Sequence, residues 1–437
     1  MLTTLKNAFK IKDIRTKILF TLAMVVVVRL GSQLPVPGVN RGYFAQWFAA
    51  QTGDAFSFFD AITGGSFLNM SVFALNISPY ITSSIIMQLL TIAIPALEEM
   101  QKDGEDGRKK IASLTRYATV ILALIQSVAM AIGFGNQGLL VKFNALNVIC
   151  CVAALTAGSM FVMWIGERIT ESGIGNGISI VLVINIISRM PQDLAQLYNQ
   201  FVKGKAPATA ILSAVVILAI LILMVVLVII LNAATRKIPV QYAKKMQGRK
   251  MVGGQTSNIP LKVNTSGVIP VIFASSIMQT PLIISSFVGS SQTGKWAEFS
   301  KYLNSQYWCN PGQLKYSIGL LVYMLLVIFF AYFYTSITFN PMLVADNLKK
   351  QGGFIPGIRP GKPTTEYLDR VLNYIIFIGA VGLLIICVLP YIFSGVFNAN
   401  VSFLGTSLII IVSVVLETVK QVESQMLVRN YKGFLND

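Results

Sequence analysis

The fold of this chain is most constrained by ten long apolar segments joined by polar connections. A membrane-spanning helix needs about 20 mainly apolar residues to cross the hydrocarbon layer of a bilayer. Charged residues form 12% of the 437 residues and hydrophobic residues 54%, whereas soluble proteins contain about 25% charged residues. We therefore predict an all-α polytopic membrane protein with spans at residues 18–34, 71–94, 114–134, 148–165, 174–187, 208–231, 266–288, 317–339, 372–392 and 401–416.

The first and last spans need separate support. Pro35-Val36-Pro37-Gly38 follows the first segment without a small-residue cleavage site, so a membrane span is expected there rather than a signal peptide. Residues 371–416 contain no charged side chain. The last two segments are therefore predicted to form a pair of spans joined by an uncharged loop.

The distribution of Lys and Arg predicts the orientation in the membrane. With ten spans, the N-terminus, the even-numbered loops and the C-terminal tail lie on one side and contain most of the 35 basic residues. Cytoplasmic segments of membrane proteins carry such an excess, so both termini are predicted to be cytoplasmic. The odd-numbered loops contain only Arg41, Lys142, Lys203, Lys205, Lys295, Lys301 and Lys315.

Residues 58–95 form an apolar stretch too long for one span, with Gly64-Gly65 near its start. We expect two helices: a span over residues 71–94 and a short piece over about 60–70 that also contains Asp60 and Asn69. Short or irregular segments at membrane depth are tolerated only where they are buried in protein or line a water-filled cavity. The short piece therefore indicates a conduit, or alternatively a connector that only packs.

Two basic loops on the predicted cytoplasmic side, residues 232–264 and 340–363, are candidates for docking. The first has seven basic and no acidic residues, and the second contains a Gly- and Pro-rich turn. Three interpretations remain: topology signals, contact with anionic lipids, or a platform for a cytosolic protein or a partner rich in nucleic acid. The shaped turn favours a protein partner. The candidate docking residues are Arg236, Lys244, Lys245, Arg249, Lys250, Lys349, Lys350 and Arg359.

The polar chemistry of many transporters and enzymes is missing from the sequence. It contains no histidine, and the predicted spans have no Asp or Glu near their centres, so proton-coupled transport lacks its usual relay. No metal site or cofactor is expected, because Cys150, Cys151, Cys309 and Cys387 have no partners at ligand spacing. We interpret these cysteines as small packing residues.

Five motifs in order resemble the bacterial SecY family, the channel subunits of the general protein translocon. The resemblance extends from about residue 14 to 424. The motifs lie at residues 29–38, at Gly64-Gly65 running into 77–81, at 173–179, at 260–264 followed by 267–270, and at 346–350 through 359–361.

The resemblance implies a fold of two pseudo-symmetric five-helix halves, at residues 1–190 and 191–424, followed by a short cytosolic tail at 425–437. It also implies a pore closed by a short plug helix and an aliphatic ring. A lateral gate is implied between the second and third spans on one side and the seventh on the other, and its polar residues are expected to form hydrogen bonds across this seam. The plug falls on Asp60, Gly64, Gly65, Phe67, Leu68 and Met70. The ring falls on Ile77, Ile81, Ile178, Leu182, Ile272 and Ile410, with Leu182 replacing a common isoleucine, and the gate on Thr82, Gln126 and Asn264.

Residue spacing supports part of the ring assignment independently. Ile77 and Ile81, and likewise Ile178 and Leu182, are four residues apart and therefore lie on one helix face. Aliphatic residues at this spacing more commonly serve ordinary helix packing. The assignment of these residues to a pore ring therefore depends on the resemblance to the SecY family.

The resemblance implies a protein-conducting channel of the bacterial plasma membrane and no enzymatic activity. The expected partners are the SecE and SecG membrane subunits, the SecA ATPase, the ribosome and preproteins with signal sequences, whereas specific DNA binding is not expected. A secondary transporter of a small solute is the alternative, since ten spans and a broken helix would also serve one. A lipid-modifying enzyme would require a nucleophile–base pair, which the sequence does not provide.

Overall fold

The structure is a computed structural model that describes most of the chain. The described residues are 9–40, 42, 60, 63–135, 138, 140, 142–203, 207–242, 245–247, 250–252, 256–288, 295–304, 307–309, 312, 314–397 and 406–433.

A helix overlaps each of the ten predicted segments in the described part of the chain. By length and apolar composition, six of the described helices qualify as membrane spans, and the bent pair α5–α6 makes a seventh. The protein is therefore a multi-pass membrane protein. The helices are α2 (Lys12–Gly31), α5 (Ser78–Ala93) with α6 (Pro95–Lys102), α7 (Glu105–Gly135), α8 (Ala145–Ser172), α9 (Gly177–Phe201), α10 (Pro207–Ala233), α11 (Ile269–Val288), α13 (Ile318–Thr338), α15 (Lys362–Phe397) and α16 (Thr406–Gly433).

The second predicted span differs from its prediction at its start. Residues 71–77 form turns, and α5 begins only at Ser78, with proline in its first turn. Asn76 has a positive φ of 48°, which interrupts a right-handed helix. At the other end, Pro95 forces Ile94 into an extended conformation, and the chain bends by 106° into α6.

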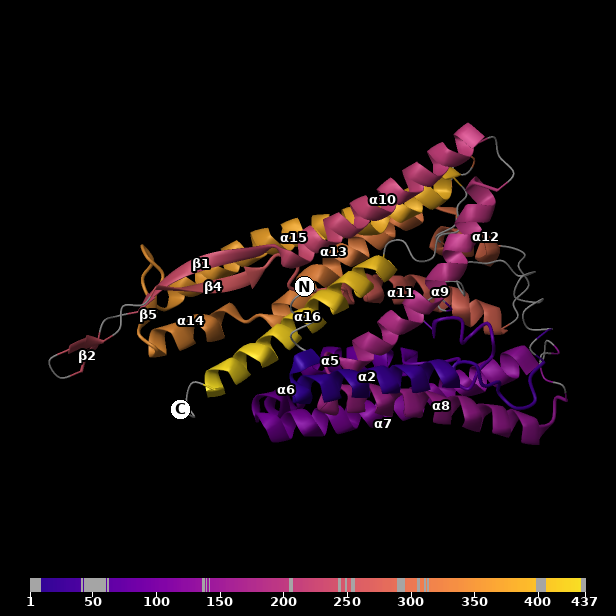
Figure 1. Cartoon of the computed structure of the whole chain (residues 1–437), viewed down its shortest axis with the longest axis horizontal. Coiled ribbons are helices and arrows are strands. Elements are labelled where there is room, and N and C mark those ends of the chain that lie inside the picture. The colour runs from indigo at the N-terminus through magenta and orange to yellow at the C-terminus, as the bar shows by residue number, and fades with distance from the viewer. Residues whose placement is uncertain are drawn as a thin grey trace.

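The helices form two groups connected by α9 and α16. In the first group α7 packs against α5 and α8, and α2 packs against α8; in the second, α13 packs against α11 and α15. Figure 1 shows the first group as the indigo and purple helices and the second above it. Helix α9 contacts α8 on one side and α16 on the other, so it joins the two groups. It extends well beyond the predicted span at 174–187, so the predicted boundary at residue 190 falls within a continuous helix.

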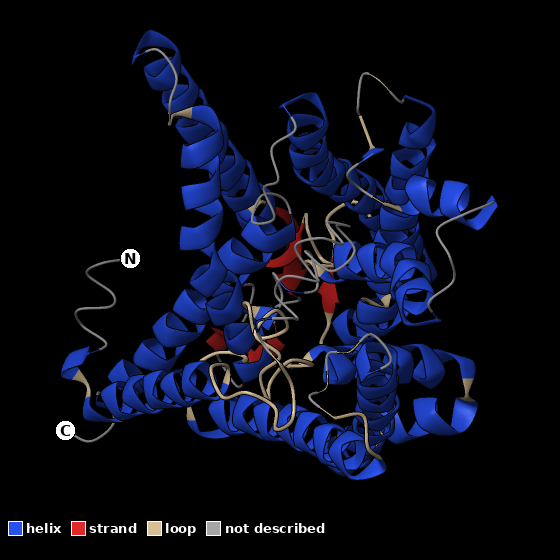
Figure 2. Cartoon of the chain, turned by 90° about the vertical axis from the view of Figure 1, so that its right-hand side faces the viewer, coloured by secondary structure: helices blue, strands red, loops and turns tan. Residues whose placement is uncertain are grey.

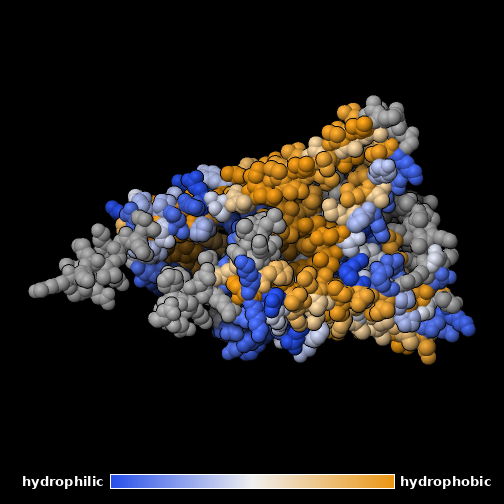
Figure 3. Space-filling view, in the orientation of Figure 1, coloured by the Kyte–Doolittle hydropathy of each residue, from blue (hydrophilic) through white to orange (hydrophobic). Residues whose placement is uncertain are grey.

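Large apolar side chains cover the outer surface of the helices. On α10, for example, Ile211, Leu212 and Val215 are exposed. Figure 3 shows this apolar surface as a broad band between hydrophilic regions at the two ends. Such a band is what a bilayer covers, because its lipid tails replace the protein contacts that bury these side chains in a soluble protein.

The two basic loops fold together into a small domain with a sheet, which was not predicted from the sequence. Strands β1 (Thr235–Tyr242), β4 (Thr256–Lys262) and β5 (Gly353–Phe354) form an antiparallel sheet in the order β4-β1-β5. A hairpin of β2 (Lys245–Gln247) and β3 (Lys250–Val252) extends from it. Ile238 and Val240 alternate with exposed residues along β1 and pack with Leu348 of α14 (Pro341–Lys350).

The sheet and α14 lie at one end of the molecule, together with α6 and the C-terminal end of α16. The short helix α12 (Lys295–Leu303) lies toward the other end (Figure 1). Viewed from the end where α12 lies, helices form the periphery of the molecule, and the described loops lie toward its middle (Figure 2). The segments assigned to the cytoplasm by their charge thus gather at one end.

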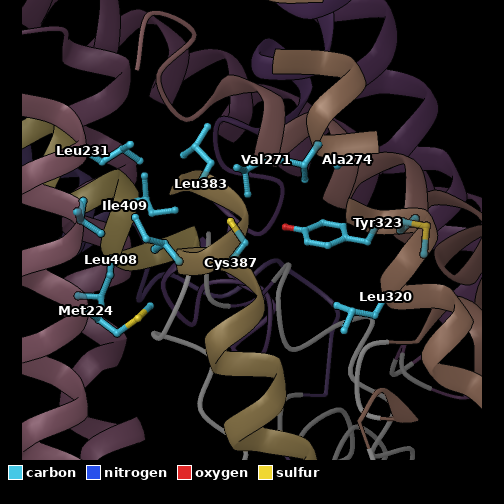
Figure 4. Close-up of a cluster of buried hydrophobic side chains, with 14 of the residues drawn as sticks. Met224, Leu231, Val271, Ala274, Leu320, Tyr323, Leu383, Cys387, Leu408 and Ile409 are labelled. Atoms are coloured by element: carbon cyan, nitrogen blue, oxygen red, sulfur yellow. The ribbon is translucent and has the colours of Figure 1, made fainter. Parts of the chain in front are cut away.

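The largest buried cluster lies in the second helix group and contains residues of α10, α11, α13, α15 and α16. Cys387 is buried in it, and the hydroxyl of Tyr323 is directed toward its sulfur (Figure 4). Cys151 is buried against α7, whereas its neighbour Cys150 is exposed. The prediction that the cysteines are packing residues is therefore confirmed for Cys151 and Cys387.

Candidate functional site

All six predicted ring residues belong to one hydrophobic cluster. Ile77, Leu182 and Ile410 are buried in it, and Ile81, Ile178 and Ile272 are partly buried and packed against it. The first two of the six positions belong to α5 and its N-cap, whereas the others come from α9, α11 and α16. Both helix groups therefore contribute side chains to the same apolar contact, which closes the space between them.

The segment assigned to the plug lies beside this cluster and is less helical than predicted. Asp60 and Thr63 are helical, but residues 64–70 form turns. Gly64 and Gly65 have φ values of 67° and 81°, a conformation that glycine adopts without strain and that ends a right-handed helix. The carboxylate of Asp60 accepts a hydrogen bond from the backbone N–H of Leu68, with Oδ1 2.9 Å from the nitrogen, and so closes the turns into a loop.

The plug segment is seated on the first helix group by apolar contacts. Phe67 and Met70 are buried among residues of α7 and α8, and the ring of Phe67 lies edge-on to that of Phe134, with centroids 6.1 Å apart. The N–H of Val36 donates a hydrogen bond to the carbonyl of Met70 at 3.0 Å. The apolar side chains of the segment thus anchor it beside the ring and not within the ring cluster.

Polar contacts attach the same segment to α9 and α2. A Cβ atom on Gly64 would lie 2.7 Å from the backbone of Asn185, so only glycine allows this approach. The carbonyl of Gly64 accepts hydrogen bonds from Ser188 Oγ at 3.4 Å and from Arg29 Nη1 at 3.3 Å. Asp60 forms an ion pair with Arg189.

One face of α9 connects the ring to the plug segment. Ile178, Leu182, Asn185, Arg189 and Asp193 follow one another at intervals of three or four residues, which places them on the same face of a helix. Only the two aliphatic members were predicted from the sequence. The polar members continue the same helical repeat, and this continuation is the signal that could have identified them.

The predicted gate residues form different hydrogen bonds from those expected. Bonds across the seam were predicted, but the hydroxyl of Thr82 donates to the carbonyl of Ser78 in its own helix. Asn264 donates to Asn232 Oδ1 at 2.9 Å, within the second helix group. The prediction of cross-seam bonds is therefore wrong for these two side-chain donors, which bond within their own helix groups, and Asn264 Oδ1 is buried without a partner among the described residues.

The seam itself is closed by packing. Helix α11 of the second group contacts α7 of the first. Gln126 lies on α7, and its side-chain oxygen is buried without a hydrogen-bond partner among the described residues. An unsatisfied buried amide favours any rearrangement that provides it with a donor.

The docking candidates that the structure describes lie on the domain built from the two basic loops. Arg236, Lys349, Lys350 and Arg359 are exposed. Lys245 and Lys250 begin strands β2 and β3, whereas Lys244 and Arg249 lie outside the described residues. Pairing of Gln241 with Phe354 brings the two loops together into one unit.

The backbone around Arg359 is held in place from both sides. Ile355 is buried in the domain's core, and the N–H of Ile358 donates to its carbonyl at 3.0 Å. Thr364 Oγ1 donates to the carbonyl of Arg359 at 2.9 Å. Gly357 and Gly361 have φ values of 84° and 105°, so the turn requires glycine at both positions. The arginine side chain therefore extends from a fixed backbone.

Fold and site together define a class: multi-pass helical membrane proteins in which an aliphatic cluster closes the space between two helix groups. The family model for SecY matches residues 71–419. The chain therefore belongs to the SecY family.

Two relatives match along their whole length. The protein translocase subunit SecY of Halalkalibacterium halodurans is 42% identical over 443 residues, covering 100% of both chains. The same subunit of Streptomyces coelicolor is 45% identical over 449 residues, again covering 100% of both.

Solved structures share the fold at lower sequence identity. One protein-conducting channel has a TM-score of 0.61 at 17% identity, covering 94% of this chain and 92% of that one. A SecY structure concerned with the plug domain has a TM-score of 0.60 at 18% identity with the same coverage. Sec61 in a canine ribosome–channel complex has a TM-score of 0.57 at 14% identity, also with the same coverage.

Proposed function

We propose that this chain is the channel-forming subunit of a bacterial protein translocase. It passes unfolded secretory preproteins across the plasma membrane and releases apolar segments sideways into the lipid. The observation that supports this most directly is the ring cluster, in which six aliphatic residues from both helix groups meet beside the anchored segment.

The aliphatic ring accounts for two opposed requirements. A polypeptide needs an aqueous path, whereas ions must not leak through it. A narrow apolar constriction excludes water when it is empty, and an ion cannot cross it without its hydration shell. The same side chains can fit loosely around an extended polypeptide without binding any particular sequence. No covalent chemistry is required of the protein.

The segment at residues 60–70 serves as the plug in this proposal. In a related SecY protein the plug domain stabilises the closed state of the channel and maintains a membrane seal. Here the segment contacts α9 at Asn185, immediately beyond the ring residue Leu182 on the same helix face. Residues 1–190 and 191–424 act as the two halves, with α9 as the connection between them.

The lateral gate opens between α7 and α11 in this scheme. Because Thr82 and Asn264 bond within their own groups, separating the two helices breaks neither of these hydrogen bonds. Closure therefore depends on side-chain packing, and Gln126 supplies a buried polar group that gains a partner when the seam opens.

Replacing Gln126 with leucine is expected to make the gate harder to open. The change removes a buried unsatisfied amide, which costs about 1–3 kcal/mol in the closed state. We expect the variant to reject weakly hydrophobic signal sequences that the parent accepts. Export of a graded series of signal-sequence variants measures this threshold.

Replacing Asn264 with leucine provides the comparison, because Asn264 Nδ2 donates to Asn232 whereas its Oδ1, like Gln126 Oε1, is buried without a partner among the described residues. Asn264→Leu removes an unsatisfied oxygen but also a membrane hydrogen bond of about 0.6–2 kcal/mol. These two effects oppose each other, so the threshold is expected to change less than in Gln126→Leu. If neither variant changes the ranking of the signal sequences, Gln126 and Asn264 take no part in the gate.

The partners follow from the proposed function and the basic domain. SecA or the ribosome docks at the exposed cations around the sheet, while SecE and SecG bind the apolar outer surface. Structural relatives include Sec61 in a canine ribosome–channel complex and the yeast Ssh1 complex bound to the 80S ribosome. Both termini and the basic domain face the cytoplasm, where anionic lipid also contacts the loops.

Reconstitution tests the function directly. The chain is placed in vesicles with SecE and SecG, and SecA, ATP and a preprotein are added outside. We expect the preprotein to become protected from external protease only when ATP is present. Uptake of a labelled small solute without any preprotein protection would instead support the secondary transporter.

A further inference from the structure

A buried group of three charges lies where the plug segment meets α9. Asp60 of the plug is 0% exposed, Arg189 of α9 is 14% exposed, and Asp193, one turn further along α9, is 4% exposed. Arg189 forms ion pairs with both carboxylates, and its Nε lies 3.5 Å from Asp193 Oδ1. One guanidinium therefore has a partner on the plug segment and another on its own helix.

The two partners differ in what happens to them when the plug leaves. Moving the segment away from α9 separates Asp60 from Arg189, whereas Asp193 remains beside the arginine because both are on α9. A buried charge without a partner is strongly unfavourable. Asp193 ensures that Arg189 retains a counter-charge after the plug has left.

We propose that Arg189 and Asp193 form a charge-exchange latch for the plug. In the closed channel Arg189 holds Asp60. In the open channel it is held by Asp193 alone, while Asp60 moves with the plug into water. Both residues are positioning residues, and the proposal depends on the proposed channel function.

Asp60 is well placed to transmit this attachment to the whole segment. Its Oδ1 accepts the N–H of Leu68, its backbone carbonyl accepts the N–H of Gly65 at 3.1 Å, and its other oxygen, Oδ2, pairs with Arg189. Asn185, which Gly64 approaches closely, lies one turn before Arg189 on α9, and Ser188, which donates to the carbonyl of Gly64, is the residue next to Arg189. Releasing the ion pair therefore loosens a segment that otherwise moves as a unit.

The latch predicts opposite effects for two isosteric substitutions around one arginine. Asp60→Asn removes the attachment, so the plug leaves more often. Asp193→Asn removes the competing partner, so Arg189 binds Asp60 more strongly and leaves an unpaired charge behind when the channel opens. If the three charges only stabilised the fold, both substitutions would shift the channel in the same direction.

The experiment uses the complete chain with its membrane partners in planar bilayers, without a preprotein, and measures the fraction of time spent conducting ions. Asp60→Asn is expected to raise it on the order of tenfold, and Asp193→Asn to lower it or leave it at the baseline. The same proteins are tested with a graded series of signal sequences. Asp193→Asn should require a more hydrophobic signal and Asp60→Asn a less hydrophobic one.

Two further variants serve as controls. Gly64→Ala should raise conduction like Asp60→Asn, because its Cβ would collide with the backbone of α9. The double variant Asp60→Asn with Asp193→Asn should behave like Asp60→Asn alone, since no attachment remains for the second change to strengthen.

The outcomes separate the latch from the channel function itself. Normal preprotein transport with equal shifts in both single variants would overturn the latch and retain the channel. Absence of preprotein transport in the parent protein would overturn the channel. If the Asp60→Asn variant does not accumulate in the membrane, the Asp193→Asn variant still tests the latch. An increase in the fraction of time that it conducts ions would overturn the proposal.

Discussion

Replacing Ile81 and Ile272 with glycine is expected to make the resting channel conduct ions. Both side chains are partly buried against the ring cluster, one from each helix group. Their loss widens the apolar constriction from both sides and allows a continuous column of water. Single-channel recording without a preprotein should change from silent to frequent openings.

Matched controls keep the backbone cost of this experiment constant. Ile86 lies on the same helix as Ile81 and is 39% exposed, and Ile277 lies on the same helix as Ile272 and is 48% exposed. Glycine costs roughly 1 kcal/mol in any helix interior relative to alanine, so Ile86→Gly with Ile277→Gly should destabilise the helices similarly but remain silent. If the Ile86 and Ile277 variant conducts as much as the Ile81 and Ile272 variant, Ile81 and Ile272 do not form the seal.

Substitution is a sharper test of the seal than deletion of residues 60–70. Deletion is also expected to cause a transient leak, but it removes Phe67 and Met70 from a core shared with α7 and α8. Burial of large apolar residues contributes several kcal/mol, so the deletion also weakens the surrounding helices.

Changing Arg359 to glutamate is expected to abolish most SecA-driven translocation while leaving insertion and assembly with SecE intact. The exposed side chain extends from a turn held by Ile355 and Thr364, so docking immobilises little additional backbone. Breaking a buried charged contact with a partner costs about 2–5 kcal/mol, whereas a merely solvated charge contributes almost nothing. ATP-dependent protection of a preprotein in vesicles measures the difference.

Arg108→Glu is the appropriate control for this prediction. It makes the same change of charge at an exposed position of α7, on the predicted cytoplasmic side but in the first helix group. Normal transport by this variant together with failure of Arg359→Glu supports a specific contact. If the Arg359→Glu and Arg108→Glu variants both show normal SecA-stimulated transport, the basic residues of this domain act only as topology signals.

The features that the sequence predicted correctly are those that depend on nearby residues. Each apolar segment corresponds to a helix because a chain in lipid must satisfy its backbone hydrogen bonds internally. The apolar stretch containing Gly64-Gly65 was expected to divide into two pieces, and both glycines have positive φ. The i,i+4 pairs of the ring were predicted to share a face, and they lie in one cluster.

The sheet was missed because its signal is short and its pairing is distant. Only Ile238 and Val240 alternate clearly within a strand that also contains Thr235, Arg236, Lys237 and Gln241. Strand β5 contributes two residues from a loop more than one hundred positions away. Pairing of this kind is decided by loop closure and shared burial, and no local pattern encodes it.

The sequence by itself determined the class of protein, the helices and the side of the membrane expected for each loop, because hydropathy and charge act on each segment separately. Only the tertiary structure decided which polar groups meet. No sequence pattern paired Asp60 of the short segment at 60–70 with Arg189, and Asn264 was expected to bond across the gate. Their partners are set by the packing of helices distant in the chain, since a buried polar group bonds to whichever partner the fold brings within reach.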